Sequence, residues 1–242
     1  MKVYFWCPFI NPVATVTAVL NSIISLNKFS KNKHDYKIIN VFKEWSMYDE
    51  ELKKNQIDSI DLGTSLNIQF LPKHGYIRSR ITYIITYLFS IFLLHRLIKK
   101  EKPNFFIIHL ISSIPLSLLL FFNYNTKFIL RISGYPKMNF LRKFLWEIAF
   151  KKVHLITCPT INTMNYLKSL NLTHESKIQL LYDPILKIEE INLKKNQKLD
   201  LRNYYIAVGR LTKQKNFFFL CKAFKELIKK NANLKLLIAG NG

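Results

Sequence analysis

The stretch YYIAVGRLTKQKNFFFLCKAFKELIKKNANLKLLIAGNG, residues 204–242, has the pattern of a strand, a helix and a second strand. Residues 204–208 are aromatic, aliphatic and β-branched, which favours a buried parallel strand. Asn216 is suited to cap a helix, and apolar residues follow it at helical spacing: Phe217, Leu220, Cys221, Phe224, Leu227 and Ile228. A second apolar run, 234–239, precedes Gly240. We therefore predict a β-α-β unit.

The turn of this unit is basic and begins with a glycine. Gly209 and Arg210 follow the predicted strand, and Lys215 and Asn216 precede the helix. Open α/β sheets bind ligands at this position, and the free amides and dipole of a helix N-terminus favour a phosphate. A basic turn is more often a solvated loop. Two glycine turns in register with two strands weaken that interpretation, and the phosphate site stays open as the alternative.

This unit resembles the start of the C-terminal domain of family-4 glycosyltransferases, which are retaining enzymes of GT-B fold. The resemblance is carried by the string VGRLTKQKN, the helix after it and the string LLIAGNG. The resemblance implies a nucleotide-sugar donor site at Gly209, Arg210, Lys215 and Asn216, with the two cations on the diphosphate. It implies no cofactor and no metal. The family's paired-glutamate motif would follow Gly242. We therefore expect the donor domain to be incomplete here, with poor donor binding and no measurable turnover by this chain alone.

The preceding residues alternate between strand and helix patterns, which predicts an α/β fold with a doubly wound parallel sheet. Expected strands are 3–6, 37–42, 68–71, 105–110, 127–132, 153–157 and 177–181, and expected helices are 12–26, 77–100, 114–122, 139–150 and 160–170. We assign 1–185 to a complete, acceptor-side N-terminal domain and 203–242 to a partial second Rossmann-like domain. Residues 186–202 lack clear periodicity and are interpreted as a linker.

Two segments of the first domain also resemble the glycosyltransferase family. FFIIH before a serine-rich turn resembles the segment whose histidine faces the acceptor, which implies a catalytic role for His109. RISGY resembles the family's R-x-H-G turn, which implies acceptor contacts by Arg131, Ser133 and Gly134. Ser133 stands where a histidine is common. A lone histidine at the end of a strand is more often structural, although strand ends in this fold point at the cleft.

The net charge of +22 is concentrated in one part of the chain. Residues 62–152 contain fourteen Lys or Arg but only two acidic residues, Glu101 and Glu147. Such a region favours anionic lipid, nucleic acid or a phosphorylated substrate. Because the sequence has no nucleic-acid recognition element, we expect no nucleic-acid partner.

The cysteines and acidic residues exclude several classes of site. Cys7, Cys158 and Cys221 are too far apart in sequence to indicate a disulfide framework or a zinc site, and they fit a reduced cytoplasm. There is no Asp-x-Asp pair, and residues 49–51 resemble a solvated charge run. A metal-dependent diphosphate site therefore has no support.

The predicted helix 77–100 has two distinct faces. One face is apolar and the other carries hydroxyl groups: Ile81, Ile84, Ile85, Leu88 and Phe92 against Thr82, Tyr83, Thr86, Tyr87 and Ser90. The helix either covers the sheet or rests on anionic lipid with its basic flanks. Residues 81–94 and 104–126 are uncharged, so a transmembrane hairpin is an alternative. Polar residues within 109–113 count against it.

The sequence therefore predicts a glycosyltransferase that moves a sugar to a glycan or lipid-linked acceptor in polysaccharide or lipopolysaccharide synthesis. Its expected location is cytoplasmic, on the inner face of the cytoplasmic membrane. One alternative is a non-catalytic membrane-surface or partner-binding module. Sugar-nucleotide epimerases are another, but the G-R-x-x-x-x-K turn favours transfer.

Overall fold

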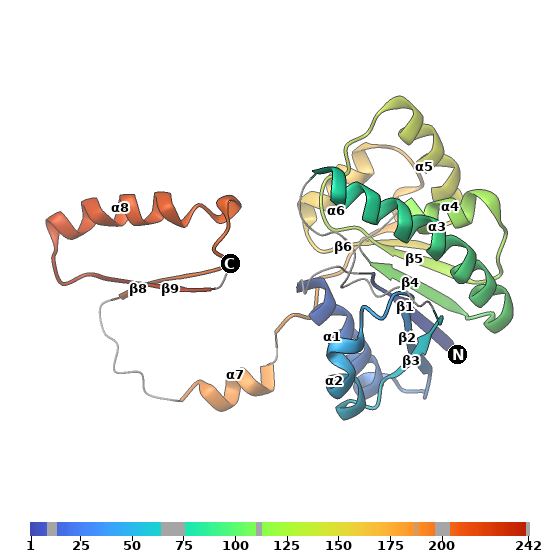
Figure 1. The fold of residues 1–242 in the computed structure, drawn as a ribbon, viewed down its shortest axis with the longest axis horizontal. Helices are drawn as coiled ribbons and strands as arrows, with labels where there is room; N and C mark the ends of the chain where they lie inside the picture. The colour runs from blue at the N-terminus through green and yellow to red at the C-terminus, as the bar shows by residue number, and fades with distance from the viewer. Residues whose placement is uncertain (9–13, 64–75, 110–112, 187, 197–203, 241–242) are drawn as a thin grey trace. The chain divides into compact units, whose positions relative to one another are not determined.

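The computed structural model describes the whole chain except residues 9–13, 64–75, 110–112, 187, 197–203 and 241–242. It contains two compact units, Met1–Leu186 and Lys187–Gly242 (Figure 1). We call them unit 1 and unit 2 and describe each by itself.

Unit 1 is built on a seven-stranded sheet in which every described pairing is parallel. The strand order is β3-β2-β1-β4-β5-β6-β7. The order reverses between β1 and β4, where such sheets bind ligands at the carboxyl ends of their strands. The predicted α/β fold with a parallel sheet is confirmed. The strands are β1 Lys2–Trp6, β2 Asp35–Asn40, β3 Asp58–Asp61, β4 Phe105–His109, β5 Lys127–Arg131, β6 Leu155–Cys158 and β7 Ile178–Leu180.

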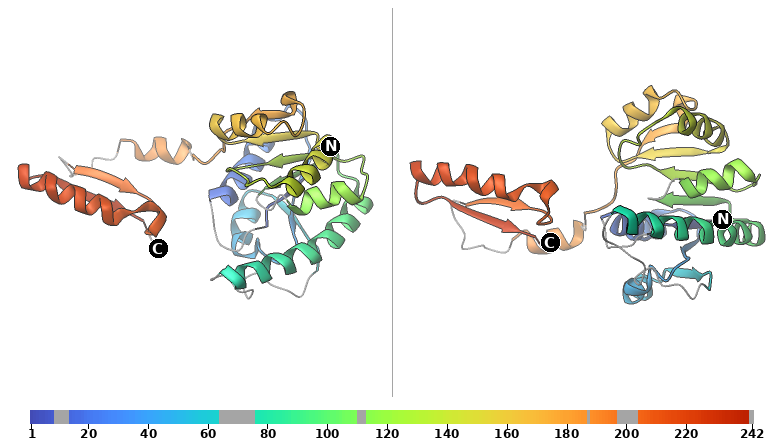
Figure 2. Two further views of the ribbon diagram at one scale, coloured as in Figure 1. Left: turned by 90° about the horizontal axis from the view of Figure 1, so that it is seen from above. Right: turned by 45° about the horizontal axis from the view of Figure 1, so that its top comes forward.

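Helices cover both faces of this sheet (Figure 2). Successive side chains of a strand point to opposite faces, so β1 contributes Tyr4 and Trp6 to one buried cluster and Val3 and Phe5 to the other. The first cluster packs under α3 Tyr76–Glu101, α4 Ser113–Phe121, α5 Phe140–Lys152 and α6 Ile161–Ser169. The second packs under α1 Ala14–Phe29, the short 3-10 helix Ser46–Tyr48 and α2 Asp49–Lys54. This two-sided cover explains why the central strands are continuous apolar runs.

Several local expectations need correction. Asp49 and Glu50 are exposed, as expected of a solvated charge run, but the run also forms the first turn of α2, where the helix dipole favours negative charge. The described strand before α3 is β3; the expected strand at 68–71 lies outside the described residues. The transmembrane hairpin is also wrong, because 104–126 contain β4, which lies inside the sheet, and the largely buried α4.

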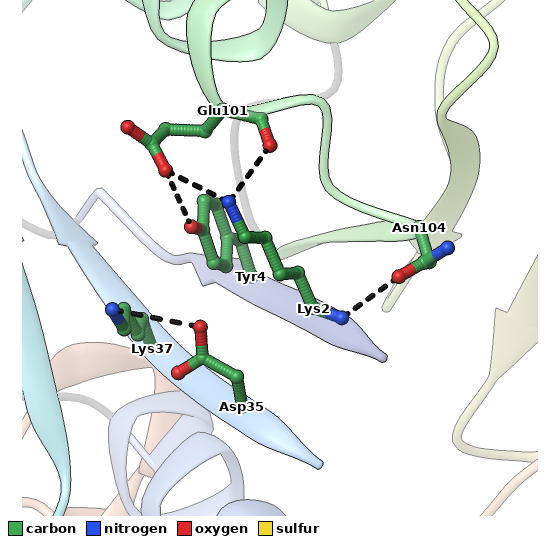
Figure 3. Close-up of polar contacts among 6 residues, drawn as sticks. All are labelled: Lys2, Tyr4, Asp35, Lys37, Glu101 and Asn104. Atoms are coloured by element: carbon green, nitrogen blue, oxygen red, sulfur yellow. Dashed lines mark hydrogen bonds and ion pairs between the residues drawn. The ribbon is translucent and has the colours of Figure 1, made fainter.

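The C-terminal end of α3 is tied to the amino end of β1 (Figure 3). Lys2 Nζ donates to both the carbonyl and the carboxylate of Glu101 at 3.1 Å, and the Tyr4 hydroxyl donates to the same carboxylate at 3.3 Å. The Lys2 amide donates to Asn104 Oδ1 at 2.8 Å. The hydrogen bond from Lys2 lowers the pKa of Glu101. Because the side chains of Lys2 and Glu101 are partly exposed, this ion pair adds little stability and mainly fixes the positions of α3 and β1.

Unit 2 contains the predicted β-α-β unit. Its elements are β8 Tyr204–Val208, the 3-10 helix Lys213–Lys215, α8 Phe217–Lys230 and β9 Lys235–Ala239, with β8 and β9 parallel. Part of the segment interpreted as a linker also forms a helix, α7 Ile188–Lys194, with acidic residues in its first turn and Lys194 in its last. These charges complement the helix dipole, a signal that apolar periodicity does not report.

The apolar residues of unit 2 are mostly exposed, so the expectation that 204–208 form a buried strand is wrong. Ile206 and Val208 are 61% and 75% exposed. Phe224 is the one buried side chain among the described residues of the unit, and it contacts Tyr205 edge-on at 5.8 Å between ring centroids. A single helix beside two strands leaves most of the sheet uncovered.

Gly240 allows a close backbone approach that a side chain would prevent. A Cβ at Gly240 would lie 1.8 Å from the Gly209 carbonyl oxygen, whereas a Cβ at Gly209 would meet ordinary contacts of 3.4 Å or more. We expect Gly240→Ala to separate the ends of β8 and β9 and to speed hydrogen exchange of the Gly209 amide, which bonds the Ala239 carbonyl at 3.0 Å. Gly209→Ala is the matched control and keeps the pairing. Equal protection in both variants would contradict this account.

Candidate functional site

The predicted donor residues all lie in one turn of unit 2, at the carboxyl end of β8. Val208 pairs with Ala239 across the two strands, and both chains then reach glycines, Gly209 and Gly240. From Gly209 the chain passes through Arg210 and the 3-10 helix to α8. The turn thus joins the end of a parallel strand to the start of a 14-residue helix, which is the geometry that favours a phosphate.

Two cations of this turn, Arg210 and Lys215, are exposed. Within the described part of the chain neither side chain makes a hydrogen bond or an ion pair. The Lys215 stem lies beside Gly209, since its Cδ would be 3.8 Å from a Cβ placed there. Both positive charges are therefore available to an anionic ligand.

Asn216 shapes the entry to α8 as predicted. Its side chain accepts a hydrogen bond from the Phe219 amide at 3.4 Å, which makes it the N-cap of the helix. Its backbone is left-handed, with φ 49° and ψ 43°, a conformation that asparagine tolerates better than most residues. The Asn216 side chain supplies one of the hydrogen bonds that the first amides of a helix lack. The other amides of the first turn remain at the end of α8 that follows Arg210 and Lys215.

In unit 1, His109 and Arg131 are neighbours at the carboxyl ends of β4 and β5. Arg131, an expected acceptor contact, is already engaged within unit 1. Its side chain is 3% exposed, and its guanidinium donates to the Leu181 carbonyl and forms an ion pair with Asp183. A cation buried in an apolar strand needs such a partner, so Arg131 fixes the segment after β7, and its acceptor contact stays a prediction.

His109 lies at the predicted edge but is 5% exposed. Burial, together with the neighbouring Arg131 charge, lowers the pKa of His109 to about 3. Its imidazole is therefore neutral at physiological pH. Its Nδ1 has no hydrogen-bond partner among the described residues. The proposed catalytic role of His109 stays a prediction.

The turn after β5 places the other two expected acceptor residues. Ser133 is exposed, and Gly134 has φ +123° with nothing within 4 Å of a Cβ built on it. That φ favours glycine, because other residues rarely adopt it. The turn therefore presents the Ser133 hydroxyl at the same edge of the sheet as His109, and its acceptor role is a prediction as well.

A buried carboxyl group at this edge was missed by the sequence analysis. Glu44 is 1% exposed and accepts the Val41 and Phe42 amides at 3.4 and 2.6 Å. Burial raises the pKa of Glu44 from an ordinary 4.5 to about 7, although the backbone hydrogen bonds oppose the shift. Burial, and then the Glu44 charge, raise the pKa of the Cys7 thiol at the end of β1. The sequence signal that could have found Glu44 was its position, two residues after the end of the second predicted strand.

The described residues offer no obvious metal site. No three His, Cys, Asp or Glu side chains among them are grouped closely enough to hold an ion. A cavity of about 500 Å³ lies at the opposite, amino-terminal edge of the sheet, where its lining includes Lys99, Lys102, Asn123 and Lys127. That cavity is therefore separate from the edge that carries His109.

Comparison with known proteins shows a similarity that includes unit 2. Residues 188–242 match the family of glycosyl transferases group 1. The sequence is 28% identical over 169 residues to an uncharacterized glycosyltransferase of Methanocaldococcus jannaschii, a match that covers 61% of this chain and 41% of that relative. The predicted resemblance to glycosyltransferases is confirmed.

Solved structures agree at the level of fold. A UDP-GlcNAc 2-epimerase from Neisseria meningitidis bound to UDP-GlcNAc has a TM-score of 0.61 at 15% identity over 98% of this chain and 65% of that chain. An alpha-glucosyltransferase in complex with UDP and DNA has a TM-score of 0.51 at 12% identity over 100% of this chain and 56% of that chain. The chain has the GT-B-type fold of such proteins and spans less than two thirds of their length.

The burial of the Arg131–Asp183 ion pair predicts how substitutions at these residues change the stability of unit 1. We expect Asp183→Asn to lower the free energy of unfolding of unit 1 by about 3 kcal/mol, because it leaves a buried guanidinium without its counter-ion. The double variant Arg131→Met/Asp183→Leu should recover most of that loss. Urea denaturation followed by tryptophan fluorescence measures both values. Losses that simply add in the double variant would show that the two side chains are not coupled.

The raised pKa of Glu44 predicts how the stability of the protein depends on pH. Its pKa in the folded protein lies above its ordinary value, so between pH 4.5 and about 7 the folded protein holds a proton that the unfolded chain releases. The contribution of Glu44 to the free energy of unfolding, taken as the difference from Glu44→Gln, should therefore fall by about 1–3 kcal/mol as pH rises through this window. Glu44→Gln should abolish that fall. Glu50→Gln, at an exposed residue, is the control. His109 also titrates differently in the folded and unfolded protein, but its contribution is the same in both variants and cancels in the comparison.

Proposed function

We propose that this chain acts in glycosyl transfer, on a sugar delivered as a nucleotide sugar to a glycan or lipid-linked acceptor. One observation carries the proposal: Arg210 and Lys215 stand exposed and unpaired, among the described residues, between a parallel strand and the N-terminus of α8. The match of residues 188–242 to glycosyl transferases group 1 supports it. The two similar solved structures also support it, because one is bound to UDP-GlcNAc and the other is in complex with UDP.

The chemistry of transfer explains why cations are needed in this turn. When the bond between the anomeric carbon and the diphosphate breaks, negative charge grows on the departing diphosphate. Arg210, Lys215 and the first amides of α8 would stabilise that charge without a metal ion. The new bond forms between the acceptor oxygen and the anomeric carbon, and the proton of the acceptor hydroxyl passes to an oxygen of the departing diphosphate.

On the acceptor side, unit 1 supplies polar groups at the carboxyl edge of the sheet. His109 would accept a hydrogen bond from the acceptor hydroxyl through a neutral nitrogen, because its low pKa keeps the ring uncharged. Ser133 would hydrogen-bond a second hydroxyl. Arg131 is a positioning residue in this scheme, since its guanidinium is engaged with Asp183. The acceptor class that we propose belongs to cell-surface polysaccharide or lipopolysaccharide synthesis at the inner face of the cytoplasmic membrane.

A second candidate is a non-catalytic surface- or partner-binding module. The observation that favours it is the exposure of unit 2, where Ile206, Val208 and Phe218 are 61–75% exposed and a single described side chain is buried. A site on so open a sheet gives little enclosure to a sugar. We therefore propose weak donor binding and no measurable turnover by the 242-residue chain alone.

Nucleotide binding tests the turn directly. We expect the chain to bind UDP at low ionic strength and Arg210→Gln or Lys215→Gln to weaken binding about fivefold to tenfold each, because each removes a cation from the diphosphate. Titration calorimetry or NMR titration with UDP measures the dissociation constant. The matched control is Lys225→Gln, the same loss of charge at an exposed residue on α8.

Two outcomes would count against the proposal. An equal effect of Lys225→Gln would mean that binding reflects net charge, and unchanged affinity in Arg210→Gln and Lys215→Gln would remove the turn from the site. Incubation with UDP-GlcNAc separates the two candidates. Turnover would support transfer and contradict the expected inactivity of the chain, whereas binding without turnover agrees with that expectation.

A further inference from the structure

Up to Ser90, the helix α3 is oriented opposite to the usual amphipathic helix of a globular domain, whereas its last turns bury Leu94, Leu97 and Ile98 in the usual way. Its outward stripe is apolar, and Ile84, Leu88 and Phe92 are 55%, 53% and 73% exposed. Its inward face carries hydroxyl groups, and Thr82, Thr86 and Ser90 are at most 1% exposed. A helix that covers a core in water normally places its apolar stripe inward, so this orientation indicates an apolar environment outside the domain.

The helix α5 repeats the pattern. Phe140, Leu141 and Phe144 are 89%, 65% and 55% exposed, and Leu145 and Ile148 extend the same stripe. Its inward residues Trp146, Ala149 and Phe150 fill the core, so α5 carries apolar side chains on both sides. Phenylalanines exposed to this degree on consecutive turns are costly in water unless something covers them.

The two stripes lie on one side of the domain. Both α3 and α5 pack against α4, on the same face of the sheet (Figures 1 and 2). The Tyr87 hydroxyl and the Ser117 hydroxyl are 2.7 Å apart and tie α3 to α4. Phe121, the last residue of α4, is 71% exposed. We call the outward residues of α3 and α5, with Phe121, the apolar–basic face.

The charges around this face are almost all positive. Exposed cations follow the stripe of α3 at Arg96, Lys99 and Lys100, and Lys143 lies within the stripe of α5. The acidic residues of the two helices are Glu101, which is bonded to Lys2, and Glu147, which pairs with Lys151. Apolar area and flanking cations act together at the surface of an anionic bilayer.

We propose that the apolar–basic face docks onto an anionic lipid bilayer, with α3 and α5 lying in the plane of the interface. Among the described residues, Arg80–Glu101 is the one helical stretch long and apolar enough to cross a membrane by length and composition. It lies on the membrane rather than crossing it, because its hydroxyl face is packed against the rest of unit 1. The inference concerns unit 1 and does not depend on the donor chemistry of unit 2.

Vesicle sedimentation with the full chain tests the proposal. The chain should bind vesicles of phosphatidylcholine mixed with phosphatidylglycerol and should bind phosphatidylcholine vesicles far more weakly, with affinity falling as salt rises. We expect Phe92→Gln/Phe140→Gln to weaken binding about tenfold or more, because two inserted rings are lost. The matched control is Phe29→Gln, a ring 75% exposed on α1 at the opposite face of the sheet.

A second pair of variants tests the charges. Lys100→Gln/Lys143→Gln should weaken binding to the anionic vesicles about 25-fold, since each cation near the surface contributes about fivefold. Lys31→Gln/Lys33→Gln removes the same charge beyond the end of α1 and should change little. Circular dichroism confirms that each variant is folded, and UDP titration in parallel shows whether the donor turn is intact.

Three results would overturn the proposal. Equal binding to neutral and anionic vesicles would remove the role of the cations, and an equal loss in Phe29→Gln would remove the specificity of the face. Self-association that is abolished by Phe92→Gln/Phe140→Gln, without vesicle binding, would assign the face to a second copy of the chain. Failure of UDP binding alone would affect the proposed function and leave the lipid surface standing.

Discussion

The buried guanidinium of Arg131 is the interaction on which the carboxyl edge of the large sheet depends. It joins β5 to the segment after β7 through the Leu181 carbonyl and the Asp183 carboxylate. The next residue, Pro184, is held from the other side by the Asn21 amide at 2.6 Å. The same positive charge lies beside His109 and helps to keep its imidazole neutral. The carboxyl edge therefore carries a fixed cation beside an uncharged ring.

The two units differ in how their positions are secured. In unit 1 the site residues follow strands that are buried on both faces, so packing fixes where His109 and Arg131 lie. In unit 2 the described residues bury one side chain, and the turn is held by local bonds: the Asn216 cap and the bond from the Gly209 amide to Ala239. Local bonds of this kind contribute about 1 kcal/mol each. The proposed donor chemistry thus belongs to the more weakly stabilised part of the chain.

Sequence patterns predicted most of this fold because parallel strands buried on both faces are apolar runs that require no knowledge of partners. They failed for α2 and α7, which are too short for apolar periodicity and are marked only by acidic first turns. The Arg131–Asp183 pair joins residues 52 positions apart, and the burial of Glu44 depends on a turn beside Cys7. Periodicity reports neither a contact between distant residues nor the dielectric around a side chain.

The orientation of α3 shows a further limit of such patterns. Periodicity separates an apolar face from a hydroxyl face, but it does not say which face meets the protein. The inward hydroxyl residues Thr82, Thr86 and Ser90 are small, so α3 approaches its neighbours closely, as small residues allow between helices in membranes. Placing the apolar stripe inward would expose these hydroxyl groups to water at little cost and bury several large side chains. The helix has the opposite orientation, with its small residues packed inside unit 1 and its apolar stripe outside. This arrangement is consistent with a domain that works at a lipid interface.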